Sequence, residues 1–210
     1  MSYQAMTTKP QLAPTRSFHH GNLRQALIDA ALSAPDIERL SLRQLASGLG
    51  VTAAAAYRHF ANREDLLFEV ARIGFDRLKH RFEDAFDLSV PPSDAAEARL
   101  RLIRLGQAYL QFADDVPALW RLMFGSQAEV YRNTASFHGA RNSYEFLPAA
   151  LMGLYQQGVI STQPDEHDAL FAWSAIHGAA TLRSGRVPAA LGPISDLGVG
   201  VADRIILALK

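Results

Sequence analysis

One short stretch of the chain combines small side chains with groups that bind phosphate, in the order TAAAAYRHF. Its Tyr57 and His59, together with Arg63 just beyond, can each donate a hydrogen bond to a phosphate oxygen of nucleic acid. Its alanines favour a helix and keep the surface low, so that the backbone can approach base edges closely. The methyl groups of Ala53 and Ala54 can contact the C5-methyl group of thymine. These residue types in this order predict a helix that lies against duplex DNA.

The preceding residues carry signals for a helix, a tight turn and a second helix. Ser41 and Gln44 match a capping box, in which the serine oxygen accepts a backbone N–H and the glutamine side chain reaches back. Gly50 is placed to adopt the left-handed conformation just past the first helix, and Thr52 is placed to cap the next, over about 53–60. This arrangement matches a helix-turn-helix motif, whose second helix enters the major groove. The two capped N-termini would add backbone N–H donors to phosphate.

The whole segment resembles a known DNA-binding domain. It is similar to TetR/AcrR-type transcriptional regulators in the string LSLRQLASGLGVTAAAAYRHFANREDLL, and the resemblance extends over about residues 18–70. Later in the chain, AWSAIHGAATL contains Trp173, His177 and Gly178 and resembles the effector domain of a subgroup with a Trp-His-Gly signature. The resemblance implies a ligand-responsive regulator that binds operator DNA as a homodimer.

The resemblance also implies DNA contacts, position by position. Arg43 corresponds to a residue that often reaches a base or a phosphate, and Tyr57 to one that contacts either. His59 and Arg63 correspond to residues that grip the DNA backbone. The full set of expected DNA-binding residues is Ser41, Arg43, Thr52, Ala53, Ala54, Tyr57, His59 and Arg63.

Two regions depart from the family pattern. Relatives carry base-reading side chains where this chain has Ala53 and Ala54, so hydrogen-bonded readout from those two positions is absent. The first helix is followed by Ala34-Pro35-Asp36 where relatives commonly have glycine. Pro35 still stops the helix, because proline lacks the backbone N–H that the helix needs.

Composition narrows the class of protein. The chain has 210 residues, 49% of them apolar, and a formal net charge of zero, so it lacks a strongly basic balance. Up to residue 75 there are eight Lys and Arg against six Asp and Glu, which makes +2, and the remainder sums to −2. The absence of cysteine excludes disulfides and thiol chemistry and is compatible with a reducing cytoplasm. We find no secretory signal and no apolar run that suits a membrane span, and we expect a cytoplasmic protein.

Hydrophobic spacing in the rest of the chain predicts helices and no strands, and therefore an all-α fold. We expect an N-terminal three-helix helix-turn-helix domain joined to a C-terminal helical bundle of about six helices. The expected division is a flexible N-terminal arm at 1–17, the DNA-binding domain at 18–65, and an effector-binding and dimerisation domain at 66–210. Outside the motif, helices are expected over about residues 22–34, 63–87, from 94 onward, 117–124, 134–157, 164–184 and 194–209.

Two local signals concern the ends and bends of these helices. Asn22 with Gln25 matches a variant of the capping box at the start of the first helix. Pro148 lies inside the expected helix 134–157, where it removes a hydrogen bond and clashes with the carbonyl of Tyr144, which predicts a kink. A kinked helix separates from its neighbours and can leave a cavity.

Aromatic side chains are concentrated in the later part of the chain, which predicts a cavity for an apolar ligand. Arg104, Gln107, His138, Arg141 and His177 are polar groups that can orient such a ligand. For each aromatic residue alone, ordinary core packing is the alternative, and for His177 it is a core histidine bonded to a neighbouring helix. The expected ligand-binding residues are Phe82, Phe86, Gln107, Tyr109, Phe112, Trp120, Phe124, Tyr144, Trp173 and His177.

The last two helices predict the interface between subunits. Residues 172–180 include alanines and a glycine that allow helices to approach closely, and residues 205–209 are largely apolar. Two such helices from each subunit would form a four-helix interface in a homodimer. Alternatively, the two helices only cover the core of their own subunit.

These observations predict a ligand-responsive DNA-binding transcriptional regulator, a repressor that binds a near-palindromic operator as a homodimer and is released by a small, mostly apolar effector. The expected partners are double-stranded operator DNA, the effector and a second copy of the chain, with no cofactor, no metal and no membrane. The common catalytic motifs do not occur, so we expect no enzyme activity. The alternatives are a helical-bundle small-molecule-binding protein or enzyme without DNA binding, in which the motif is an ordinary αα-hairpin, and a protein-interaction module.

Overall fold

The computed structural model describes residues 22–125, 143–184 and 192–210, and the expected arm at 1–17 lies outside them. Within the described residues all regular structure is helical, which confirms the predicted all-α fold. No helix in these ranges is long and apolar enough to cross a bilayer. The elements are α1 (Leu23–Leu32), the 3₁₀ turn η1 (Ile37–Arg39), α2 (Leu42–Gly48), α3 (Ala53–Tyr57), α4 (Arg63–Ala85), α5 (Ala95–Asp115), α6 (Pro117–Phe124), α9 (Phe146–Gln156), α10 (Glu166–Ser184) and α11 (Ile194–Ala208).

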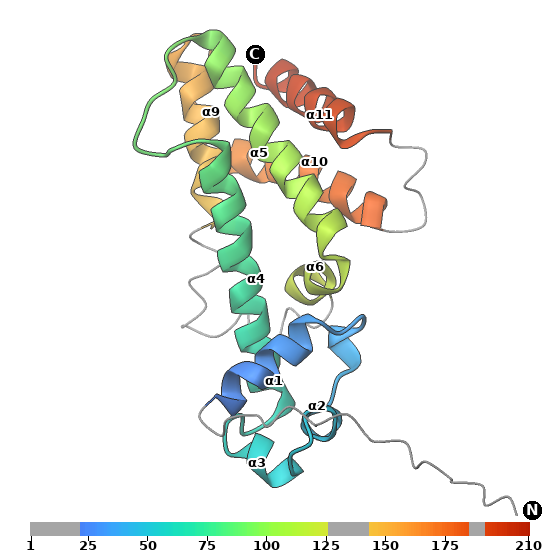
Figure 1. Cartoon of the computed structure of the whole chain (residues 1–210). Coiled ribbons are helices and arrows are strands. Elements are labelled where there is room, and N and C mark those ends of the chain that lie inside the picture. The colour runs from blue at the N-terminus through green and yellow to red at the C-terminus, as the bar shows by residue number, and fades with distance from the viewer. Residues whose placement is uncertain (1–21, 126–142, 185–191) are drawn as a thin grey trace, which may run out of the picture.

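The helices form two groups that α4 connects (Figure 1). The short helices α1, α2 and α3 gather at one end of the molecule, around the first turns of α4. From there α4 runs to the opposite end, where α5, α9, α10 and α11 pack together. Between the two groups lies α6, which packs on both α4 and η1. The expected domain boundary between residues 65 and 66 therefore falls inside one continuous helix, because α4 begins at Arg63.

Local hydrogen bonds fix the helix-turn-helix geometry, as the sequence predicts. The Ser41 Oγ accepts the backbone N–H of Gln44 at 3.2 Å, and the Gln44 side chain accepts the backbone N–H of Ser41 at 3.0 Å. Gly50 has a φ of 71°, a left-handed conformation that favours glycine. Thr52 Oγ1 then accepts the N–H of Ala55 at 3.2 Å and caps α3. These side chains satisfy N–H groups that have no partner inside the helix, so both short helices have defined starts.

The structure differs from the sequence prediction at three points, two before this motif and one at the end of its second helix. Asn22 makes no capping hydrogen bond, and its ψ of 33° lies outside the extended conformation that the other side-chain caps adopt; the Gln25 side chain donates to Asp29 Oδ1 at 2.8 Å. A 3₁₀ turn that the sequence did not predict, η1, follows the first helix, and its Ile37 is almost fully buried. Finally, α3 ends at Tyr57, earlier than predicted, and is only five residues long.

The expected helix 134–157 is interrupted near Pro148, where the sequence predicts a kink, and the interruption is a break between two helices. The described part of the expected helix 134–157 has a turn at Glu145, and α9 starts directly after it, so Pro148 lies in the first turn of a separate helix. A missing N–H is tolerated there, because the first N–H groups of a helix have no intrahelical partner. His138 and Arg141, which were expected near the ligand, lie outside the described residues.

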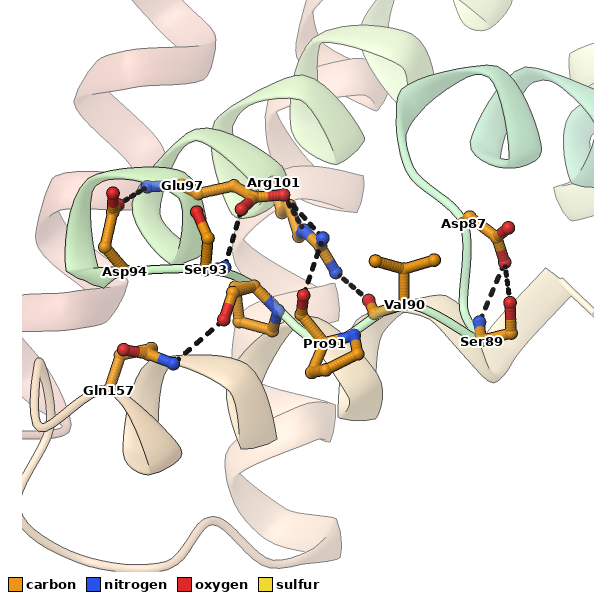
Figure 2. A network of polar contacts seen from close by, with 10 residues as sticks. Asp87, Ser89, Val90, Pro91, Ser93, Asp94, Glu97, Arg101 and Gln157 are labelled. Carbon is orange, nitrogen blue, oxygen red and sulfur yellow. Dashed lines mark hydrogen bonds and ion pairs between the residues drawn. The ribbon is translucent and has the colours of Figure 1, made fainter.

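The far end of α4 is fixed to α5 by a buried arginine (Figure 2). Arg101 is only 7% exposed, and its guanidinium donates to the backbone oxygens of Val90 and Pro91 and to the carboxylate of Glu97. The same guanidinium lies 5.3 Å from the centre of the Phe86 ring, in a cation–π contact. The Arg101 side chain therefore holds together the end of α4, the segment that follows it and the first turns of α5.

The carboxylate of Glu97 makes this network sensitive to acid. Hydrogen bonds from the hydroxyl and N–H of Ser93, and then the guanidinium of Arg101, lower the pKa of Glu97 from 4.5 to about 2. A carboxyl group whose pKa is lower in the folded state stabilises the fold above pH 4.5, and this stabilisation is lost as the pH falls towards 2. We therefore expect Glu97→Gln to destabilise the protein at neutral pH and to have little effect at the acid end of this range. The denaturant midpoints of Glu97→Gln and of the unmodified protein are compared from neutral pH to the acid end of this range, with the exposed Glu145→Gln as the control. A difference between the two midpoints that does not become smaller as the pH falls would contradict this expectation.

Close packing joins α4 to α6. A methyl group built on Gly74 would lie 2.5 Å from Met123 Sδ and 3.1 Å from Leu119 Cδ1. The absence of a side chain at Gly74 therefore allows α6 to lie directly against the backbone of α4. Because α6 also packs on η1, the two helix groups are in contact through α6 as well as through α4.

Candidate DNA-binding surface and effector cavity

The third helix presents one face to the protein and the opposite face to solvent. Ala55 and Ala56 are buried, whereas Ala54, Tyr57 and His59 are exposed. The Tyr57 side chain is 44% exposed, so it does not fill the interior of the domain. Small residues anchor the inner face, and hydrogen-bond donors extend from the outer one. This is the arrangement that a helix needs in order to enter a DNA groove.

The other predicted contact residues flank this outer face. Arg43 is exposed on α2, Thr52 is exposed at the start of α3, and Ser41 and Ala53 are half-buried. The hydroxyl groups of Ser41 and Thr52 serve as helix caps. The Ser41 hydroxyl also donates to Gln44 Oε1 at 2.9 Å, so a DNA contact at Ser41 depends on backbone N–H groups. The Thr52 hydroxyl only accepts as a cap, so its proton remains able to donate to a phosphate.

Arg58 is a contact candidate that the sequence-based set omits. It follows Tyr57 directly, and its side chain is exposed. Within the part of the chain that the structure describes, no hydrogen bond or ion pair holds this side chain. The signal that could have identified it is simple, because Arg58 is the basic residue of the TAAAAYRHF stretch itself.

Arg63 is placed differently from the prediction. Its guanidinium turns back to η1, where Nε donates to the Leu40 carbonyl at 2.8 Å and another nitrogen donates to the Glu38 carbonyl. The remaining nitrogen lies 3.4 Å from the Glu64 carboxylate. Arg63 thus connects the start of α4 to the turn that leads into α2, and its donors are engaged within the protein.

A cavity of about 440 Å³ lies inside the second group of helices. This volume falls within the range of small-molecule sites, roughly 300–1,000 Å³. Its walls are mostly apolar and come from α4, α5, α6, α9, α10 and α11, together with Ser143 and Tyr144 just before α9. Five of the ten expected ligand-binding residues line it, namely Phe82, Tyr109, Phe124, Tyr144 and Trp173.

Two of the other expected residues lie at the edges of this group of helices and do not line the cavity. The Phe86 ring packs against Phe146, with ring centres 5.6 Å apart, and also contacts the Arg101 guanidinium. The Gln107 side chain donates to the Ser195 carbonyl at 3.2 Å and so joins α5 to the start of α11. Both side chains therefore stabilise helix ends instead of facing a ligand.

The remaining three, Phe112, Trp120 and His177, lie behind the cavity wall. Phe112 is buried next to Trp120, whose ring centre lies 4.9 Å from that of Tyr109. His177 packs against Trp120 and against Phe124, at 5.3 and 5.0 Å between ring centres. Sequence periodicity places these residues on inward faces but does not separate the wall itself from the core that supports it.

One group of hydrogen-bonded side chains lies at the wall. The Tyr109 oxygen accepts the Nε1–H of Trp173 at 3.0 Å and lies 2.8 Å from Nδ1 of His177. Tyr109 and Trp173 line the cavity, so His177 supports them from behind, as a histidine bonded to a neighbouring helix. Burial raises the pKa of Tyr109 well above its usual range, which keeps the hydroxyl protonated.

Sequence reasoning missed the wall that α5 and α11 form. On α11 the lining residues are Gly198, Val201, Ala202 and Ile205, which recur at helical spacing. On α5, Gly106 lies among the lining residues and contributes no side chain. Small residues leave space for a ligand, but they have no aromatic or polar group by which a sequence would identify a binding site. The helical spacing of the lining residues on α11 is equally typical of ordinary core packing.

Family models match both parts of the chain. Residues 27–70 match bacterial regulatory proteins of the tetR family, and residues 102–194 match a tetracyclin repressor-like C-terminal domain. The chain belongs to the TetR family. The first match contains the helix-turn-helix motif, and the second contains most of the cavity wall. Among curated proteins no significant match was found.

Solved structures share the architecture of this TetR-family protein. A protein of unknown function from Rhodococcus sp. RHA1 is 31% identical, with a TM-score of 0.74 over 92% of this chain and 98% of that one. The TetR-family regulator PfmR from Thermus thermophilus is 22% identical, with a TM-score of 0.63 over 89% and 99% of the two chains. A tetR-family regulatory protein from Rhodococcus RHA1 is 16% identical, with a TM-score of 0.64 over 89% and 96%.

Family membership establishes the general class of activity. TetR-family proteins are transcriptional regulators with a helix-turn-helix domain that binds DNA and a C-terminal domain that binds ligands, and they are typically dimers. They are not enzymes, so the alternative of a helical-bundle enzyme is set aside. The assignment to a Trp-His-Gly subgroup stays a prediction.

Proposed function

We propose that this TetR-family protein is a repressor, which binds a near-palindromic operator as a homodimer and leaves it when a small, mostly apolar effector fills the cavity. The observation that carries the proposal is the course of α4. Its first turns hold the α1–α3 group (Figure 1), and its later turns contribute Phe75, Leu78 and Phe82 to the cavity wall. A cytoplasmic location, where operator DNA is accessible, is part of the proposal.

The exposed face around α3 supports the DNA contacts. Tyr57, Arg58 and His59 can donate to phosphate oxygens from the end of α3, and Arg43 can do so from α2. Ala54 is exposed between these donors and can contact a thymine methyl group. Arg63 acts in this proposal as a positioning residue instead of a phosphate contact, since η1 carbonyls already accept its hydrogen bonds.

The outer faces of α10 and α11 support a homodimer. Phe171 and Leu182 on α10 and Val199 and Leu207 on α11 are exposed large apolar residues, with Leu207 71% exposed. The opposite faces of both helices pack on α5 and line the cavity, so they also cover the core of their own subunit. Pairing the two helices with those of a second subunit would bury the exposed residues in a four-helix interface. The two-fold axis would then present both α3 helices to successive major grooves, about 34–36 Å apart.

Two contacts would transmit the effect of a ligand to α3. The first is α4 itself, which runs from the cavity to the DNA-binding group. The second is α6, which places Met123 and Phe124 in the cavity wall and packs on η1, where Arg63 in turn holds the start of α4. A ligand shifts the equilibrium only if it binds one arrangement more tightly than the other. We infer that filling the cavity moves α4 and α6 and changes the separation of the paired α3 helices.

Selection of bound sequences from a random DNA pool tests this proposal. We expect an inverted repeat whose half-sites are centred about 10 base pairs apart, or a multiple of that spacing. The double variant Tyr57→Ala with Arg58→Ala is the control: both side chains are exposed, so the variant should fold normally and enrich no sequence. Failure of the unmodified protein to enrich any sequence would contradict operator binding, and an asymmetric single site would contradict the homodimer.

A further inference from the structure

The chemistry of the cavity wall restricts the ligand. Among the described residues that line it, no side chain carries a charge. Charged side chains on α5 and α10 bond to each other instead, as in the pair of Arg183 and Asp114 at 2.8 Å. The polar groups of the wall are neutral and come from Tyr109, Ser143, Tyr144 and Trp173. An ionised ligand would lose its hydration there and meet no opposite charge in this part of the wall, so binding would strongly disfavour it.

The Tyr109 hydroxyl is the polar group whose position is best defined. It accepts the Trp173 N–H at 3.0 Å, and a second hydrogen bond joins it to Nδ1 of His177 at 2.8 Å. A tyrosine hydroxyl has one proton and two lone pairs, and these contacts use two of the three. The remaining direction is the O–H proton when Nδ1–H of His177 donates, and a lone pair when Nδ1 accepts. A ligand hydroxyl can pair with Tyr109 in both cases, and a ligand carbonyl in the first.

We propose that the effector is an uncharged, mostly hydrocarbon molecule that presents one hydroxyl or carbonyl oxygen to Tyr109. This inference deepens the proposed function and rests on it for the claim that the ligand controls DNA binding. The hydrocarbon part extends from the aromatic end of the cavity, at Phe75 and Phe82, to the end that small residues form, at Gly106 and Ala202.

The expected preference for uncharged ligands is tested with probes of similar chain length. The purified full-length protein is titrated at neutral pH with n-decanol, methyl decanoate and decanoate, and binding is followed by tryptophan fluorescence. The chain has two tryptophans, Trp173 in the cavity wall and Trp120 directly behind it, so the signal reports on this site. We expect both uncharged probes to bind at least about 100-fold more tightly than decanoate, because nothing described in the wall compensates the carboxylate.

The oxygen contact is tested with Tyr109→Phe. Loss of one hydrogen bond should weaken n-decanol binding about fivefold to tenfold and leave the affinity for n-decane unchanged, since n-decane has no oxygen. Tyr155→Phe, at an exposed tyrosine of α9, is the matched control. If Tyr109 only supported the fold, its substitution would weaken both probes equally, and this result would overturn the proposed oxygen contact.

The small-residue end is tested with Ala202→Leu. The added side chain would occupy part of the cavity at α11, so it should weaken n-decanol more than the shorter n-hexanol. Ala208→Leu, on the exposed side of the same helix, should change neither. Equal weakening of both alcohols in Ala202→Leu would show that the ligand does not reach this end.

Two results would overturn the assignment of an uncharged ligand. One is decanoate binding as tightly as methyl decanoate, and the other is no fluorescence change with any uncharged probe up to its solubility limit. Selection from the DNA pool is a separate measurement. A protein that binds n-decanol but selects no DNA sequence would contradict the proposed function and support the ligand class. A protein that selects a DNA sequence but binds none of the uncharged probes would support operator binding and contradict the ligand class.

Discussion

Replacing Arg101 by alanine should lower the free energy of unfolding by about 2–4 kcal/mol, because each hydrogen bond from a charged group contributes about 1.5–3 kcal/mol and the bonds are not additive. The buried guanidinium bonds to the backbone oxygens of Val90 and Pro91 and to Glu97 (Figure 2). It also contacts the Phe86 ring. Without it, the carbonyl oxygens of Val90 and Pro91 and the carboxylate of Glu97 would lose their partner, and a cavity would remain beside the aromatic ring.

The matched control for this variant is Arg104→Ala, one turn further along α5. Arg104 is exposed, so its removal should change stability by less than about 0.5 kcal/mol. Denaturant unfolding measures both variants, and an unchanged slope would show that only stability has altered. Equal midpoints for Arg101→Ala and Arg104→Ala would contradict the role of Arg101 in fixing α4 to α5.

Replacing Tyr57 by alanine should weaken operator binding at least about tenfold, since a hydrogen bond to a phosphate contributes about 1.5–3 kcal/mol. Tyr57 is 44% exposed on the outer face of α3, so the loss should occur without unfolding. Tyr57→Phe should account for most of the loss if the hydroxyl makes the contact. Fluorescence anisotropy with the selected operator at one fixed salt concentration measures these affinities.

The control for Tyr57 is Tyr155, an exposed tyrosine on α9 at the opposite end of the molecule (Figure 1). Tyr155→Ala should leave operator affinity unchanged. An operator affinity of Tyr57→Ala within twofold of the unmodified protein would remove Tyr57 from the DNA contacts and leave Arg58 and Arg43 as the principal candidates.

Helix starts were predictable from sequence because their determinants are local. Asn62 Oδ1 accepts the N–H of Asp65 at 2.8 Å, and Asp94 Oδ1 accepts the N–H of Glu97 at 2.8 Å, three residues ahead in each case. Pro117 is likewise found in the first turn of α6. A cap needs only the right side chain and the next turn of backbone, so sequence spacing identifies it. Asn22 is the exception, because its backbone does not adopt the extended conformation that directs a capping side chain to the helix N–H groups.

The role of Arg63 was not predictable in this way. Its hydrogen bonds reach the carbonyls of Glu38 and Leu40, more than twenty residues earlier in the chain. Those carbonyls are in reach because η1 folds beside the start of α4, and η1 itself depends on the burial of Ile37. An exposed phosphate contact and an internal clamp use the same guanidinium chemistry, and only the positions of the acceptors distinguish them.

The sequence by itself determined the helical class, the helix-turn-helix motif and the outward donors near Tyr57, because capping and helical spacing act over one or two turns. The tertiary structure alone decided which aromatic residues line the cavity and which stand behind it. Tyr109, Trp173 and His177 meet although α5 and α10 are far apart in the chain, and other parts of the wall depend on side chains that are absent, as at Gly106 and Gly198. A cavity is space that packed helices leave between them, so its position and chemistry depend on how the helices cross.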